Sequence, residues 1–119
     1  MEIDRWAIYE KYGGHCAYCG ETIEFKAMQV DHIRPKRRFS VGHIDNIPKY
    51  HVDDLQNLNP ACRVCNNWKL VWTVDEFRYE IEQQVKRLRK YRAQYRLAER
   101  YGLVINIDKP VIFYFERKE

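Results

Sequence analysis

The sequence predicts an α+β fold, and three observations support this class. Two Cys-x-x-Cys pairs frame the first half of the chain. Between these pairs, residues 22–30 alternate apolar and polar side chains as a β-strand does. After the second pair, residues 74–101 carry an apolar stripe with helical spacing. With 119 residues, 45% of them hydrophobic, the chain is long enough to bury one core. We therefore expect a small α+β domain that continues into a long helix.

The composition excludes several classes of protein. Aromatic residues make up 14% and charged residues 32% of the chain, which excludes a wholly disordered chain, a collagen-like repeat and a disulfide-dense mini-protein. The chain lacks the run of roughly 18 apolar residues that a membrane span needs, so we expect no membrane partner. Residues 1–6 do not combine a basic region with an apolar stretch, so we expect no signal peptide and a cytoplasmic location.

The cysteines form the pairs Cys16–Cys19 and Cys62–Cys65, with 42 residues between the pairs. Two such knuckles can close a tetrahedral Cys₄ zinc site, and Gly20 suits the tight turn after the first pair. One Cys-x-x-Cys could also be a redox pair. Because both pairs together use every cysteine of the chain, structural zinc is the better interpretation. The zinc must then bracket an inserted element, in which we look for function.

The first elements predicted are a short helix and a strand. Residues 3–12 have helical apolar spacing, and Gly13-Gly14 ends that helix. Residues 22–30 form a strand or hairpin arm, and Asp31 and His32 stand at its end.

A long loop separates this strand from the second cysteine pair. Pro35 breaks regular strand pairing, and residues 36–53 are polar and irregular. Loops of this length are usually functional or mobile. A short helix is expected to begin at or near Cys65.

The clearest helix is predicted over residues 74–101. Thr73 is a suitable N-cap, Glu76 completes a capping box, and Gly102 suits the position after the helix.

The last part of the chain predicts a hairpin. Residues 103–107 and 111–115 are rich in β-formers and flank a short turn with Pro110. We therefore expect a zinc-bracketed core at 1–73, with a basic helix and hairpin at 74–119 that pack on or extend the same domain.

Basic residues are concentrated in two places, although the formal net charge is only +4. Residues 83–100 contain one acidic and seven basic residues, and a second cluster comprises Arg34, Lys36, Arg37 and Arg38. Such patches suggest a polyanionic partner. The alternative is a solvated helix face, because the acidic residues of 75–82 followed by a basic half also complement the helix dipole.

Four polar residues of the inserted element and its flank stand in a distinctive order. Asp31-His32 ends the strand, Asn57 precedes a leucine, and Asn66 follows Cys65. Singly, an Asp-His pair is more often a surface hydrogen-bonding group, and such asparagines are usually turn or cap residues. Their order relative to the two knuckles is what carries information.

In that order, the segment from His15 to about Leu70 resembles the HNH nuclease family in its zinc-bracketed form. The matching pieces are Cys16–Cys19, Asp31-His32-Ile33-Arg34-Pro35, Asn57-Leu58 and Cys62-Arg63-Val64-Cys65-Asn66-Asn67-Trp68-Lys69. The resemblance implies a ββα-metal core that hydrolyses phosphodiester bonds.

The resemblance also implies roles for these residues. His32 would be the general base, and its ordinary pKa near neutrality suits that task. Asp31 and Asn66 would hold a divalent cation, and oxygen donors favour Mg²⁺ or Mn²⁺. Asn57 would steady the loop and orient the base. The family pattern often has His where this chain has Asn66, so the triad here is His-Asn-Asn.

The expected substrate is double-stranded DNA, either nicked or cut through both strands, and cutting both strands would need a homodimer or two successive visits. Residues expected to contact nucleic acid are Arg34, Lys36, Arg37, Arg38, Lys69, Lys86, Arg89 and Lys90. His43, His51, Asp53 and Asp54 are either further ligands and substrate contacts or ordinary loop residues. Two alternatives remain: a non-catalytic zinc module that binds nucleic acid, and an RNA-directed nuclease.

Overall fold

The computed structural model describes residues 3–35 and 52–117, which form two compact units. The cysteine unit comprises Met1–Val74 and Ile112–Glu119, and the basic unit comprises Asp75–Val111. In the described part of the chain, no helix is both long and apolar enough to span a membrane.

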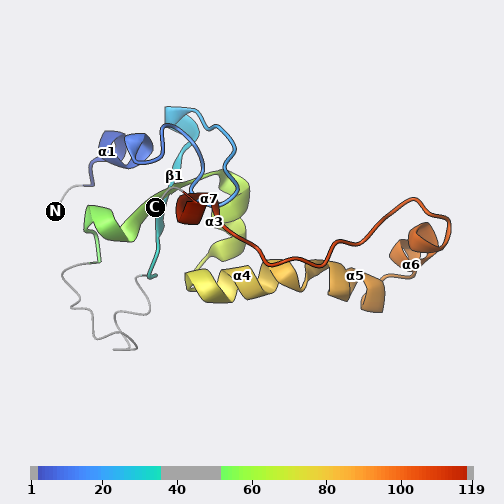
Figure 1. The fold of residues 1–119 in the computed structure, drawn as a ribbon. Coiled ribbons are helices and arrows are strands. Elements are labelled where there is room, and N and C mark those ends of the chain that lie inside the picture. The colour runs from blue at the N-terminus through green and yellow to red at the C-terminus, as the bar shows by residue number, and fades with distance from the viewer. Residues whose placement is uncertain (1–2, 36–51, 118–119) are drawn as a thin grey trace. The chain divides into compact units, whose positions relative to one another are not determined.

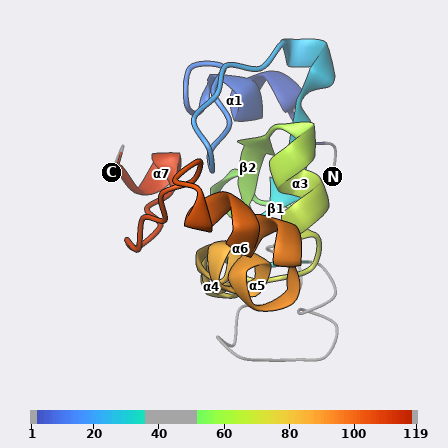
Figure 2. The same cartoon turned by 90° about the vertical axis from the view of Figure 1, so that its right-hand side faces the viewer.

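The centre of the cysteine unit is a ββα arrangement. Strand β1 (Gln29–His32) pairs antiparallel with β2 (Leu58–Ala61), and helix α3 (Arg63–Lys69) packs on β1 (Figures 1 and 2). The register sets Asp31 opposite Asn59 and His32 opposite Leu58. Strand β1 ends at His32, as predicted, and the α+β fold class is confirmed.

The core of this unit lies beneath helix α1 (Arg5–Glu10), which is shorter than the predicted helix over 3–12. Asp4 caps α1 by accepting the Ala7 N–H at 3.1 Å. Three buried side chains form the centre of this core: Ile8 of α1, Met28 just before β1, and Leu58 of β2. The partly buried side chains packed against them are Ile3, Tyr9, Ile23 and Val30.

The predicted strand over 22–30 is correct only at its end. Phe25–Ala27 instead form the short 3₁₀-helix η1, and Thr22 makes an isolated bridge to His15. The Arg5 guanidinium donates to the carbonyls of Phe25 (3.2 Å) and Met28 (3.0 Å), which stabilises this turn. A side chain distant in sequence therefore overrides the alternating pattern.

The predicted C-terminal hairpin is wrong, because described residues 103–117 contain no strand. Tyr114 and Phe115, the first two residues of helix α7 (Tyr114–Arg117), donate their backbone N–H groups to the carbonyls of Tyr18 (3.0 Å) and Ala17 (2.8 Å). Phe113 is buried and meets the Tyr18 ring edge-on at 5.1 Å. The second apolar run therefore packs on the first cysteine knuckle rather than on the first apolar run.

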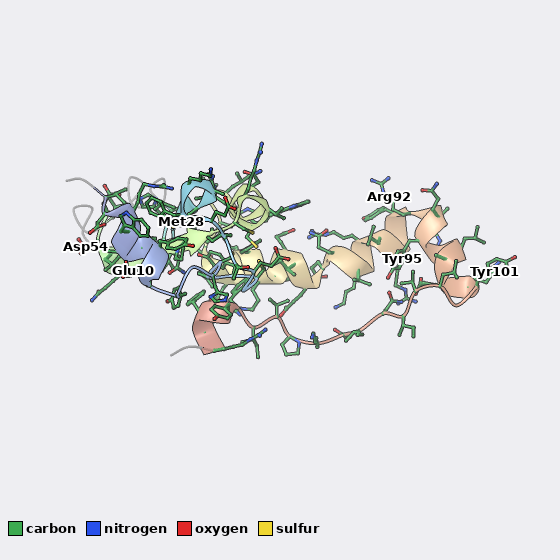
Figure 3. All side chains as sticks on the ribbon, turned by 90° about the horizontal axis from the view of Figure 1, so that it is seen from above. Glu10, Met28, Asp54, Arg92, Tyr95 and Tyr101 are labelled. Carbon is green, nitrogen blue, oxygen red and sulfur yellow. The ribbon has the colours of Figure 1, made fainter. Side chains whose placement is uncertain are left out.

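The predicted long helix is three helices: α4 (Val74–Glu82), α5 (Gln84–Tyr91) and α6 (Ala93–Arg100). Arg92 takes an extended conformation between α5 and α6. The Arg96 guanidinium donates to the carbonyls of Arg89 (2.8 Å) and Lys90 (3.0 Å), which satisfies the end of α5. Arg92 and Tyr101 extend away from the ribbon (Figure 3). An amphipathic stripe is equally compatible with successive short helices, so the pattern alone did not predict these breaks.

Candidate functional site

The four cysteines converge on one point of the cysteine unit. Their Sγ atoms all lie within 4.8 Å of one another, and Cys19 and Cys62 are 3.8 Å apart. A tetrahedral zinc with bonds of about 2.3 Å separates its sulfurs by ~3.8 Å, so this donor set fits zinc. The four thiols are free of disulfides.

Hydrogen bonds prepare the two knuckles for a metal. Backbone N–H groups of Tyr18 and Cys65 donate to the sulfurs of Cys16 and Cys62, each at 3.4 Å. A hydrogen bond from the Cys65 thiol lowers the pKa of Cys16 to about 4, whereas burial raises the pKa of Cys19 to about 11. The hydrogen bond between Cys16 and Cys65 therefore favours a thiolate within this pair, which is the form that binds zinc.

A second site lies where β1 meets the end of α3. An open pocket of about 180 Å³ is lined by Val30, Asp31, His32, Pro35, Asn66, Leu70 and Val71. Strand β1 supplies the carboxylate and the imidazole, and α3 supplies the amide. Three of the residues that the sequence singled out, Asp31, His32 and Asn66, therefore line one pocket.

The imidazole of His32 is held by a loop carboxylate. Its Nε2 lies 2.7 Å from Oδ1 of Asp53, and both side chains are partly exposed. Since an ionised carboxylate only accepts hydrogen bonds, Nε2 carries the hydrogen and donates a hydrogen bond to Asp53. Nδ1 of His32 is then the nitrogen that can accept a proton.

Asn57 ties the two sides of the long loop together. Its side-chain oxygen accepts the Arg34 N–H at 2.9 Å, and its amide donates to the carbonyls of Val52 (2.8 Å) and Arg34 (3.2 Å). The Asn57 carbonyl also accepts the Ile33 N–H at 2.8 Å. This asparagine fixes the backbone on either side of the loop that carries Asp53.

The carboxylate of Asp31 is buried and makes two polar contacts inside the protein. Lys69 donates to Oδ1 at 3.1 Å, and the Tyr18 hydroxyl donates to Oδ2. Burial raises the pKa of Asp31, although the Lys69 ammonium opposes this shift. Burial also raises the pKa of Tyr18, so its hydroxyl stays a donor.

Lys69 was predicted to contact nucleic acid, and this prediction is wrong. Its side chain is fully buried, and its ammonium also donates to the carbonyls of His32 (2.9 Å) and Ile33 (3.3 Å). An ammonium held in this way is not available to a phosphate. Instead Lys69 fastens the end of α3 to the end of β1.

The other predicted nucleic-acid contacts have four different outcomes. Arg34 is half-buried, and Lys36, Arg37 and Arg38 lie outside the described residues, as do His43 and His51. Lys86 and Lys90 are exposed on α5. Arg89 is exposed but pairs with Glu99 at 3.1 Å. Asp54 lines another open pocket, with Ile3 and Leu55 among its neighbours.

Sequence reasoning missed three residues of the site. Asp53 was predicted only as a further ligand, a substrate contact or an ordinary loop residue, although its place four residues before Asn57 puts it on the segment that Asn57 anchors. Tyr18 lies inside the first knuckle, and nothing in its spacing predicted a bond to Asp31. The role of Lys69 was missed because a lysine at a helix end is usually solvated.

Comparison with known proteins supports the assignment of this region. Residues 16–69 match the family model described as HNH endonuclease. No curated protein and no solved structure matches the chain.

Proposed function

We propose that this protein is a metal-dependent endonuclease that hydrolyses phosphodiester bonds in DNA, because residues 16–69 match the family model described as HNH endonuclease. The observation that carries the proposal is the pocket shared by Asp31, His32 and Asn66, in which Asp53 orients the imidazole. A protein that only bound nucleic acid would have no use for an oriented imidazole beside a carboxylate.

His32 is the general base in this proposal. Nδ1 takes a proton from the attacking water while Nε2–H stays bonded to Asp53, whose negative charge stabilises the resulting imidazolium. The water oxygen bonds to phosphorus, and the bond between phosphorus and the leaving oxygen of the DNA strand breaks. Asn57 keeps the loop of Asp53 in place, so the imidazole does not need to reorient during the reaction.

Asp31 and Asn66 are the residues that would hold a divalent cation. A carboxylate and an amide oxygen suit Mg²⁺ or Mn²⁺, and the pocket lies between them. When bound, such a cation supplies charge stabilisation to the leaving oxygen. Lys69 and Tyr18 fix the orientation of the Asp31 carboxylate, because each donates to one of its oxygens.

Substrate binding is assigned to the basic residues that the described surface exposes. Lys86 and Lys90 on α5, with Arg92 and Arg100, are exposed side chains suited to phosphate contacts. Such contacts bind the backbone of the nucleic acid without reading its sequence. One catalytic pocket cuts one strand at a time, so a nick is the expected first product.

A cleavage assay with matched substrates tests this proposal. Purified zinc-loaded protein is incubated with the same sequence as duplex DNA, single-stranded DNA and RNA, each with Mg²⁺, with Mn²⁺ or with no added divalent cation. We expect cleavage of duplex DNA that requires the metal and is lost in Asn66→Ala. Cleavage of RNA alone would favour an RNA-directed nuclease, and binding without cleavage of any substrate would favour a non-catalytic module.

A further inference from the structure

Leu70, at the rim of the catalytic pocket, has a backbone conformation that leucine rarely adopts. Its φ is +46° and its ψ is −115°, and among the described residues it is the one non-glycine residue with positive φ. The other described positions with positive φ are all glycine: Gly13, Gly14, Gly20 and Gly102. A leucine therefore occupies a position where glycine would fold with less strain.

Burial of the side chain does not compensate for this strain. Leu70 is 66% exposed, and the adjacent Val71 is 37% exposed. Both residues line the pocket that contains Asp31, His32 and Asn66. The leucine side chain thus adds little to the hydrophobic core, although it stands beside the catalytic candidates.

The position of Leu70 is also rigidly fixed. Its backbone N–H donates to the Asn66 carbonyl at 3.0 Å, and the Trp72 N–H donates to the Lys69 carbonyl at 2.9 Å. Lys69, the preceding residue, is anchored by hydrogen bonds to the Asp31 carboxylate and to the carbonyls of His32 and Ile33. These hydrogen bonds therefore fix the backbone of Leu70 relative to Asp31 and Asn66, the residues that would hold the cation.

We propose that Leu70 is a substrate-contacting residue, an apolar wedge that packs on the sugar and base edges of duplex DNA next to the scissile phosphate. This inference rests on the proposed nuclease function, since the phosphate in the pocket determines which part of the substrate reaches Leu70. Apolar side chains that wedge between base steps are a known way to deform a duplex and bring its backbone to a protein surface. Backbone strain retained at a functional site is expected when the side chain there has a task in the complex.

The test is the substitution Leu70→Gly, which separates folding from function. Glycine relieves the positive φ, so the midpoint of thermal unfolding of the zinc-loaded protein is expected to rise, by about 2–8 °C. The rate of duplex cleavage at saturating metal is expected to fall by about 10-fold or more. Leu70→Met keeps the apolar bulk and should retain most of the wild-type rate.

Val64→Ala is the matched control. Val64 lies on α3, the helix that ends just before Leu70, and is also 66% exposed, but it does not line the pocket. Its cleavage rate should stay within about two-fold of the wild type. The salt dependence of duplex binding provides an independent readout, because loss of an apolar contact leaves the slope of log K against log salt unchanged, whereas loss of one phosphate contact lowers it by about 1.

Each outcome decides the proposal. A more stable Leu70→Gly protein that cleaves slowly, with an unchanged salt slope, supports the wedge. A Leu70→Gly protein that cleaves duplex DNA as fast as the wild type overturns the wedge and leaves the nuclease proposal intact. A wild-type protein that cleaves no nucleic acid overturns both.

Discussion

Replacing Lys69 by methionine is expected to destabilise the cysteine unit by about 3–5 kcal/mol. Methionine has a similar length and no charge, so the substitution removes the ammonium but little of the packing. The Lys69 and Asp31 side chains are 0% and 3% exposed, and their charged atoms are 3.1 Å apart. Without the ammonium, the buried Asp31 carboxylate loses its compensating charge, and the carbonyls of His32 and Ile33 lose a donor.

Removing both charges should restore much of this loss. In the double variant Asp31→Asn, Lys69→Met, no ionised group is left without its partner, so we expect a coupling energy of roughly 2 kcal/mol or more in a double-mutant cycle. Lys86→Met is the control for loss of a lysine at the surface, and its effect should stay within about 0.5 kcal/mol.

The pH dependence of the Lys69→Met effect has a defined sign. Burial raises the pKa of Asp31 in the folded protein, so its ionised form is the costly one. A carboxyl group with a raised folded pKa favours folding below its unfolded pKa, and this contribution is lost as the pH rises through the folded pKa. The destabilisation by Lys69→Met should therefore be largest at alkaline pH and shrink as the pH falls towards the ordinary carboxyl range.

Urea unfolding of the zinc-loaded proteins, followed by tryptophan fluorescence, measures these free energies. The comparison of wild type and variant at each pH cancels the effect of acid on the zinc ligands. A loss below about 1 kcal/mol for Lys69→Met, or a loss that grows as the pH falls, would refute this account of the buried pair.

Three further predictions concern the site and its support. Asp53→Asn should lower kcat for DNA cleavage by about 10–100-fold with little change in KM or in the unfolding midpoint, because the imidazole of His32 loses its carboxylate partner. An unchanged kcat in steady-state kinetics would contradict this prediction. Phe113→Ala should cost about 3–5 kcal/mol of stability, measured by urea unfolding, because its ring is buried against Tyr18; a loss below 1 kcal/mol would mean that the C-terminal segment does not support the knuckle. Removal of zinc by a chelator should unfold the cysteine unit, seen as loss of far-ultraviolet circular dichroism that returns when zinc is added back, and an unchanged spectrum would contradict a structural role for the metal.

The parts of the fold that the sequence predicted correctly are those with local and chemically specific signals. Thiolates at Cys-x-x-Cys spacing have few uses other than a shared metal, so the cluster was predictable without a structure. The end of β1 at His32 follows from the same order of motifs, as does a short helix at the second knuckle, which was predicted from about Cys65 and begins at Arg63. These signals depend on residue type and spacing, both of which the sequence carries directly.

The parts that were missed or predicted incorrectly depend on contacts between residues far apart in the sequence. The apolar run around Phe113 has strand composition, but backbone bonds to the knuckle hold its neighbours Tyr114 and Phe115. The ion pair of Lys69 with Asp31 spans 38 positions, and the bond from His32 to Asp53 spans 21. No spacing rule predicts such partners, since they meet only after β1, β2 and α3 have assembled.

The most direct test of the central claim is cleavage of supercoiled plasmid by wild-type protein and by His32→Ala, both loaded with zinc and supplied with Mg²⁺. Equal unfolding midpoints of the two proteins establish that the variant is folded. The account predicts nicked circles from the wild type and a rate reduced by about 10²-fold or more in His32→Ala. Equal cleavage by the two proteins would contradict the assignment of His32 as the general base and, with it, the proposed catalytic pocket.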